Sequence, residues 1–169
     1  AQVVMENYDP SFASSIAQER ARRADNGEDA AVVLVSGYNF GTGSSREQAA
    51  TALKYAGVPV VLAGSFSDVF KRNAINNGLI CLQCPELVDD LTSSYAKDGQ
   101  RGAGGRQPGE LSVLLRDATV SLDSRTGAVE LRFGNGSVKR YTTRPAGIGR
   151  SIQEIYVAGG MESWVKQRL

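Results

Sequence analysis

Short apolar runs alternate with helical segments between residues 31 and 95, and this alternation limits the fold more than any other feature of the chain. The runs are rich in β-branched residues, which is typical of buried strands. They are 31–35, 58–63 and 79–82. Apolar residues at helical spacing separate them, and Pro85 opens a further helix that extends to about Tyr95. The order strand–helix–strand–helix–strand predicts an α/β fold on a small parallel sheet with crossover helices.

Other patterns flank this core. Residues 11–24 have apolar side chains at helical spacing, and Ser11 can cap the start of that helix. Residues 97–110 form a glycine-rich segment that we interpret as a flexible loop. After it, short runs of alternating polarity predict antiparallel strands at 113–115, 119–122, 129–133 and 137–141. Two terminal helices follow, one with an apolar stripe from Ile148 to Tyr156 and a short one anchored by Trp164.

The segment SGYNFGTGSSREQAATAL, residues 36–53, joins the first predicted strand to a glycine-rich turn and then to a helix. We expect this helix to begin at Ser44 and to extend to about Ala56. The N–H groups and the positive dipole end at a helix start favour an anion. Arg46 lies in the first helical turn, where a guanidinium can bind a carboxylate through two hydrogen bonds. The segment therefore predicts an anion site.

The same residues also fit a purely structural device. Ser44 and Glu47 have the spacing of a capping box, in which Ser44 is the N-cap and Glu47 is the N3 residue. From the residues alone, the capping interpretation is favoured. Asn73, Asn76 and Asn77 precede a glycine at the end of the next predicted helix, and we interpret them as ordinary helix-end residues.

The composition excludes several classes of function. The chain has 169 residues, which suits one domain, and no histidine, so it cannot build a Ser-His-Asp triad, a Cys-His pair or an HExxH zinc site alone. Its net charge is +1, which gives no electrostatic footprint for nucleic acid or a membrane surface. No signal peptide, transit peptide or membrane span is visible in the sequence.

The two cysteines, Cys81 and Cys84, form a CxxC motif but are too few for a zinc site or an iron–sulfur cluster. On or just after a strand, their spacing places the two thiols on opposite faces. We interpret both as structural cysteines and predict no metal site in this chain.

A family resemblance adds to this interpretation. GTGSSREQAATAL, residues 41–53, resembles the signature of the C-terminal swivelling domain of the aconitase superfamily. The resemblance extends through VPVVLAGSFSDVFKRNAINNGL, residues 58–79, and residues 151–169 look like the C-terminus of fungal homoaconitases. Thr42 and Gln48 stand where isopropylmalate isomerases typically carry Cys and His, so the pattern is most similar to the homoaconitase family.

This resemblance implies a fold and a reaction. The fold would be the β/β/α three-layer swivel, and residues 1–169 would be one such domain of a larger mitochondrial hydro-lyase. That enzyme would hydrate cis-homoaconitate to homoisocitrate in the α-aminoadipate route of lysine biosynthesis. Its [4Fe-4S] cluster would be held by other domains of the same polypeptide. Here Ser44 would be the base, Ser45 and Arg46 would bind a substrate carboxylate, and the isolated domain would be inactive.

Three alternatives stay open at this point. The nearest is an isopropylmalate isomerase or an aconitase-type hydro-lyase that acts on another di- or tricarboxylic acid. The second is a nucleic-acid-binding module, against which the net charge of +1 argues. The third is a non-catalytic module in which Ser44 only caps its helix.

Overall fold

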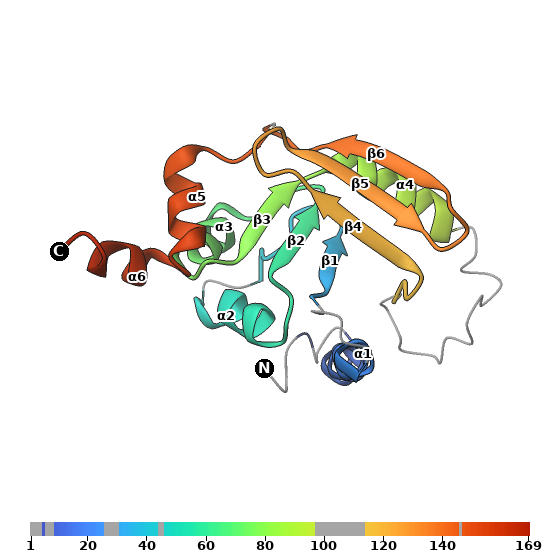
Figure 1. Ribbon diagram of the computed structural model, residues 1–169, viewed down its shortest axis with the longest axis horizontal. Helices are drawn as coiled ribbons and strands as arrows, with labels where there is room; N and C mark the ends of the chain where they lie inside the picture. Colours follow the sequence, from blue (N-terminus) through green and yellow to red (C-terminus); the bar gives the residue numbers. More distant parts are fainter. Residues whose placement is uncertain (1–4, 6–8, 26–30, 44–45, 97–113, 146) are drawn as a thin grey trace.

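The computed structural model describes residues 5, 9–25, 31–43, 46–96, 114–145 and 147–169 (Figure 1). Six helices and six strands lie in this part of the chain. In order they are α1 (Phe12–Asp25), β1 (Val33–Ser36), α2 (Gln48–Tyr55), β2 (Val60–Ala63), α3 (Asp68–Asn76), β3 (Ile80–Gln83), α4 (Pro85–Ala96), β4 (Ala118–Leu122), β5 (Ala128–Phe133), β6 (Val138–Thr142), α5 (Arg150–Val157) and α6 (Met161–Lys166). No helix among these residues is long and apolar enough to cross a membrane.

The strands form two separate sheets of three. The first is parallel, has the order β1-β2-β3 and pairs Val35 with Leu62 and Leu62 with Leu82. The second is antiparallel, has the order β4-β5-β6 and pairs Val120 with Leu131. Both types of sheet were predicted from the sequence. The parallel sheet precedes the antiparallel sheet along the chain, as expected.

The parallel sheet is the middle of three layers because both of its faces are apolar. Along β2, Val61 and Ala63 join one buried cluster, whereas Leu62 joins another. We call the first the helical core; it consists of Phe12, Ile16, Ala50, Leu53, Val58, Val61, Ala63, Phe66, Phe70, Ala74, Leu79 and Cys81. We call the second the sheet core; it consists of Leu62, Leu82, Cys84, Leu87, Val129 and Leu131. The antiparallel sheet covers one face and α1–α3 cover the other, which confirms the predicted β/β/α fold (Figure 1).

Two local predictions were wrong. The helix expected from Ser44 begins at Gln48, with Glu47 at the N-cap position in helical backbone geometry and without a side-chain cap hydrogen bond. Glu47 is therefore not the N3 residue of a capping box. Of the strand expected at 113–115, residues 114 and 115 have no strand structure, because β4 begins only at Ala118.

The start of α1 also differs in detail from the prediction. The Oδ1 atom of Asp9 accepts hydrogen bonds from the backbone N–H of Ser11 at 2.9 Å and from its hydroxyl at 2.7 Å. Ser11 is thus a donor here, and the buried Asp9 carboxylate is the acceptor that organises the helix start. An aspartate before a helix satisfies N–H groups that have no partner within the helix.

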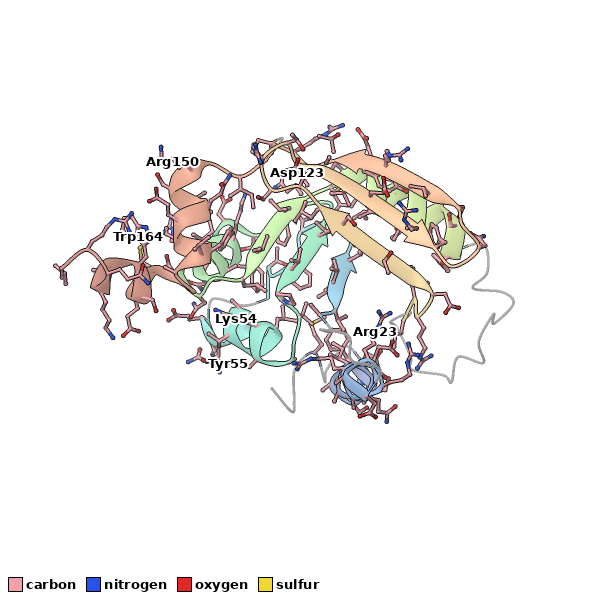
Figure 2. All side chains as sticks on the ribbon, in the orientation of Figure 1. Arg23, Lys54, Tyr55, Asp123, Arg150 and Trp164 are labelled. Carbon is pink, nitrogen blue, oxygen red and sulfur yellow. The ribbon has the colours of Figure 1, made fainter. Side chains whose placement is uncertain are left out.

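A buried carboxylate connects α1 to the segment before β4. Glu19 is only 5% exposed and lies 2.6 Å from Arg22 and 3.0 Å from Arg23 on its own helix. Arg116 approaches the same carboxylate at 3.4 Å, and Arg23 donates to the Arg116 carbonyl at 3.1 Å (Figure 2). The guanidinium groups, Arg22 first, lower the pKa of Glu19 to about 2 against the opposing effect of burial.

Main-chain atoms come close together where the end of α3 meets the C-terminal helices. A Cβ atom on Gly78 would lie 2.8 Å from the carbonyl carbon of Gly159, and one on Gly160 would lie 2.7 Å from the carbonyl oxygen of Asn76. Lys54 of α2 closes this junction, since its Nζ donates to the carbonyls of Asn77 at 2.8 Å and Gly159 at 2.9 Å (Figure 2). We call this contact the glycine junction.

Candidate active site

The glycine-rich turn lies at the carboxyl end of β1, the edge of an open α/β sheet at which ligands bind. The loop after β2 holds it through three backbone hydrogen bonds. Gly64 donates to the carbonyl of Gly37 at 3.0 Å, Phe40 to that of Ser65 at 2.9 Å, and Ser67 to that of Phe40 at 2.9 Å. The turn thus continues the pairing of β1 with β2 beyond the strands themselves.

Three phenylalanines form the base of the turn. The Phe40 ring packs edge-on against Phe66 and Phe70, with centroids 6.0 and 5.2 Å apart. Phe66 and Phe70 stack with an angle of 4° between their planes. Because Phe66 and Phe70 belong to the helical core, they connect the turn directly to the packing of that layer.

Gly41 follows Phe40 and tolerates no side chain. Its φ is +82°, and a Cβ atom there would lie 2.4 Å from Cγ of Phe70. The backbone passes over the aromatic ring at a distance that glycine alone allows. Gly43 differs, because a Cβ atom on it would meet no described residue within 4 Å.

Asn39 adopts a left-handed backbone, with a φ of +57°. Its N–H donates to Oγ of Ser65 at 2.7 Å, and that hydroxyl donates to Oδ1 of Asn39 at 3.3 Å. Asparagine is among the few residues that adopt this conformation at modest cost. The residue type is thus a signal in the sequence, although no role was predicted for Asn39.

Tyr38 crosses from the turn to α4. Its hydroxyl donates to Oδ1 of Asp89 at 2.8 Å, and this hydrogen bond raises the pKa of Tyr38. A Cβ atom on Gly64 would lie 2.8 Å from the Tyr38 ring, so the ring packs closely on the loop after β2. No local sequence pattern indicates the Tyr38–Asp89 pair, since its members lie 51 positions apart.

Arg46 lies at the end of the turn, next to Glu47 at the N-cap position of α2, and is exposed. Its carbonyl accepts the N–H of Ala49 at 3.2 Å. The next residue, Glu47, accepts a hydrogen bond from Nδ2 of Asn77 at 2.8 Å. The other two predicted site residues, Ser44 and Ser45, lie outside the described residues. The structure therefore places Arg46 beside the turn, whereas the roles of Ser44 and Ser45 stay predictions.

The two cysteines lie in different layers. Cys81 belongs to the helical core and Cys84 to the sheet core, so the parallel sheet separates them. Both are buried, and burial raises the pKa of the Cys84 thiol and that of Cys81 to about 12. This donor set does not fit an iron–sulfur cluster, which needs several thiolates on one side. Among the described residues, no group of three or more His, Cys, Asp or Glu could hold a metal ion.

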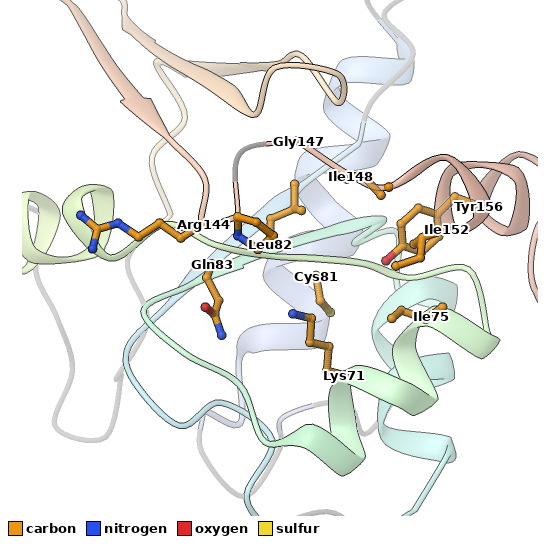
Figure 3. Close-up of a pocket in the computed structure, with 12 residues that line it drawn as sticks. Lys71, Ile75, Cys81, Leu82, Gln83, Arg144, Gly147, Ile148, Ile152 and Tyr156 are labelled. Carbon is orange, nitrogen blue, oxygen red and sulfur yellow. The ribbon is translucent and has the colours of Figure 1, made fainter.

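A small cavity lies between α3, β3 and α5 (Figure 3). It measures about 80 Å³, and its lining includes Lys71, Cys81, Gln83, Arg144 and Tyr156 as well as aliphatic side chains. The described residues of the turn, 37–43 and 46–47, do not line it. Burial raises the pKa of Tyr156 to about 12, which keeps this phenol neutral. The cavity is thus mostly apolar and separate from the described part of the candidate active site.

Comparison with known proteins shows similarity to one family model and to several curated relatives. Residues 7–87 match the family described as the aconitase C-terminal domain. The whole chain aligns with the mitochondrial homoaconitase of Mycosarcoma maydis at 56% identity and with that of Cryptococcus neoformans at 47%. In each case it covers 23% of the relative. The chain is thus similar to aconitase C-terminal domains over residues 7–87 and to homoaconitases over its whole length.

A solved structure is similar to this chain as well. The crystal structure of a 3-isopropylmalate dehydratase from Methanocaldococcus jannaschii is similar, with a TM-score of 0.54 and 33% sequence identity. The similarity covers 80% of this chain and 64% of that one. The chain spans less than a quarter of the length of its homoaconitase relatives.

Proposed function

We propose that this chain is the C-terminal swivel domain of a larger homoaconitate hydratase, a hydro-lyase that converts cis-homoaconitate to homoisocitrate. The observation that carries the proposal is the GTGSSRE turn at the carboxyl edge of the parallel sheet, in a chain 56% identical to a homoaconitase. The relatives are named mitochondrial, and we extend that location to this protein.

The chemistry of the turn suits a polycarboxylate substrate. Arg46 is exposed beside the turn, and a guanidinium pairs with a carboxylate through two parallel hydrogen bonds. Ser44, two residues earlier, is the proposed base that removes the carbon-bound proton, and Ser45 is a second carboxylate ligand. A serine hydroxyl is a weak base, and a neighbouring cation and backbone N–H groups lower the free energy of its alkoxide.

The iron–sulfur cluster belongs, in this proposal, to other domains of the same polypeptide. Cys81 and Cys84 are buried on opposite sides of the parallel sheet, so they do not offer the cluster a common set of ligands. The domain's own contribution is to hold the substrate carboxylate and to move the proton. We therefore expect the isolated domain to be inactive. We also propose that residues 1–169 form one domain; the glycine-rich segment 97–110, which the sequence predicts to be a loop, lies outside the described residues.

Ser44→Ala in the full-length, cluster-reconstituted enzyme tests the catalytic part of the proposal. We expect kcat to fall about a thousandfold, because a positioned acid–base group contributes roughly 10² to 10⁴. Loss of the ultraviolet absorbance of the conjugated double bond of cis-homoaconitate measures the reaction. Ser14→Ala is the matched control, since the hydroxyl of this exposed serine donates to its own helix, to the Ser11 carbonyl at 2.8 Å.

The outcomes separate the open alternatives. Near-normal turnover by Ser44→Ala in the folded, cluster-loaded enzyme would contradict the catalytic role of Ser44. Turnover of an isopropylmalate-derived alkene in preference to cis-homoaconitate would contradict the proposed substrate. It would leave the proposed role of Ser44 as the base unchanged. We choose this second substrate because a similar solved structure is an isopropylmalate dehydratase.

A further inference from the structure

Asn77, just beyond the end of α3, reaches the start of α2 next to Arg46. We propose that Asn77 is a positioning residue for the candidate active site, acting through the carboxylate of Glu47. The inference rests on the proposed function, because it concerns the reaction that Arg46 serves. It assigns a role to an asparagine that the sequence had marked only as a helix end.

The hydrogen bonds of Asn77 point in two directions. Its Nδ2 donates to the Asn73 carbonyl of its own helix at 2.8 Å and to Oε1 of Glu47 at 2.8 Å. The bond to Asn73 orients the amide, so its second N–H is directed at Glu47. A helix-end role explains the first bond. It does not explain the second, which spans 30 residues.

The backbone of Asn77 is itself held in place by hydrogen bonds. Its N–H donates to the Asn73 carbonyl at 3.1 Å, and its carbonyl accepts from Nζ of Lys54 at 2.8 Å. The next residue, Gly78, belongs to the glycine junction, where its backbone packs closely on Gly159. Asn77 is thus fixed by α3, by α2 and by the C-terminal helices.

The contact with Asn77 restrains the start of α2. Glu47 stands at the N-cap position, and its own side chain does not cap the helix there. Its carboxylate is bonded to Asn77, so a long-range contact supplies the restraint that a capping side chain provides elsewhere. Arg46 shares a peptide bond with Glu47, and Ser44 and Ser45 directly precede it in the sequence. A shift of Glu47 therefore moves Arg46, the proposed carboxylate ligand to which it is bonded.

A donor–acceptor exchange tests the proposal in the full-length enzyme. Asn77→Asp removes the donor and places a second carboxylate against Glu47. We expect kcat/KM for cis-homoaconitate to fall on the order of 100-fold, mainly through KM, since a displacement of about 1 Å has this effect on positioned groups. Adding Glu47→Gln supplies an N–H donor from the other side, and the double variant is expected to regain at least about tenfold of that loss.

The control and a second measurement separate positioning from folding. Asn135→Asp makes the same charge change in the β5–β6 hairpin, where Oδ1 accepts the Ser137 N–H and an aspartate can still do so. Hydrogen–deuterium exchange of amides 46–53 reports the order of the start of α2 without any assay of activity. We expect exchange to accelerate in Asn77→Asp and to slow again in the double variant.

Each result decides one point. Unchanged exchange in Asn77→Asp, or a double variant no better than the single one in both measurements, would overturn the positioning role. Faster exchange with unchanged kcat/KM would reduce the contact to a structural one and would equally overturn it. A wild-type enzyme inactive on cis-homoaconitate would contradict the proposed function, and the exchange data would still decide whether Asn77 holds the start of α2.

Discussion

The two faces of the parallel sheet are packed by different means. The helical core contains Phe66 and Phe70, on which the turn residue Phe40 rests, so its packing extends to the candidate active site. The sheet core is aliphatic, with Leu62, Leu131 and their neighbours between two sheets, and none of its buried members belongs to the turn. The domain therefore separates packing that shapes the site from packing that only stabilises the fold.

This difference has a measurable consequence. Damage to the helical core should lower both the stability and the activity of the folded enzyme, whereas equal damage to the sheet core should lower stability alone. Matched substitutions on the two sides of the parallel sheet test whether the two cores differ in this way.

Truncation of one large side chain on each side has the largest effect. Phe70 and Leu131 are only 2% and 3% exposed. We expect Phe70→Ala to cost about 4 kcal/mol of unfolding free energy and Leu131→Ala about 3 kcal/mol. Under conditions where both variants are folded, Phe70→Ala should lower kcat/KM by more than about tenfold through the turn. Urea unfolding and steady-state kinetics measure the two effects, and an equal loss of activity in Leu131→Ala would refute the separation.

Glycine substitutions give a finer comparison. Gly41 and Gly136 have nearly the same φ, +82° and +83°, but of the two only Gly41 has a described neighbour, Phe70, that a Cβ atom would strike. Gly136→Ala in the β5–β6 hairpin should cost about 1 kcal/mol, the backbone cost alone. Gly41→Ala should cost about 3 kcal/mol, because overpacking adds to that cost, and should impair turnover. Equal stabilities of the two variants by thermal unfolding would show that Phe70 yields without cost.

A substitution of Glu19 tests whether the contact between α1 and the segment before β4 stabilises the fold. Because the folded pKa of about 2 lies below the ordinary value of 4.5, its stabilising effect is complete above pH 4.5 and is lost as pH falls towards 2. Glu19→Gln should lower the free energy of unfolding by about 2 kcal/mol at neutral pH, since hydrogen bonds to charged groups are lost. The variant should also lose less of its free energy of unfolding than the wild-type protein as the pH falls. Urea unfolding at several pH values measures this.

The control for that experiment is an exposed ion pair. Glu162 lies 2.6 Å from Lys166 on α6 and is 83% exposed, so Glu162→Gln should leave stability unchanged within error. Activity unaffected by Glu19→Gln is expected, because α1 does not contribute to the turn. If the stability of Glu19→Gln fell with acidic pH as steeply as that of the wild-type protein, Arg22, Arg23 and Arg116 would not hold this carboxylate ionised.

Local sequence patterns predicted the elements well. Runs of β-branched residues placed β1, β2 and β3 within a few residues, and Pro85 marked the first residue of α4 correctly. The opposite placement of Cys81 and Cys84 followed from strand geometry. These features depend on neighbours in the chain, and periodicity reports such neighbours directly.

Long-range contacts leave no such local pattern. The capping-box spacing of Ser44 and Glu47 suggested an early helix start, but the Glu47 carboxylate bonds to Asn77 and α2 begins at Gln48. The support of the turn by Phe66 and Phe70 is equally invisible, because it depends on how α3 and the loop before it pack against the turn. Arg46 was found by its position beside the turn, whereas the residues that hold that position had no local signal.

The glycine junction also bears on how such a domain can evolve. Gly78 and Gly160 let main chain pack on main chain, so the C-terminal helices are attached without a contribution from their own side chains at these points. Selection can therefore change the exposed residues of α5 and α6, such as Val157, with little penalty to the attachment. The two glycines allow no such drift. A lineage that keeps them can adapt its C-terminal helices to new surroundings while the candidate active site stays undisturbed.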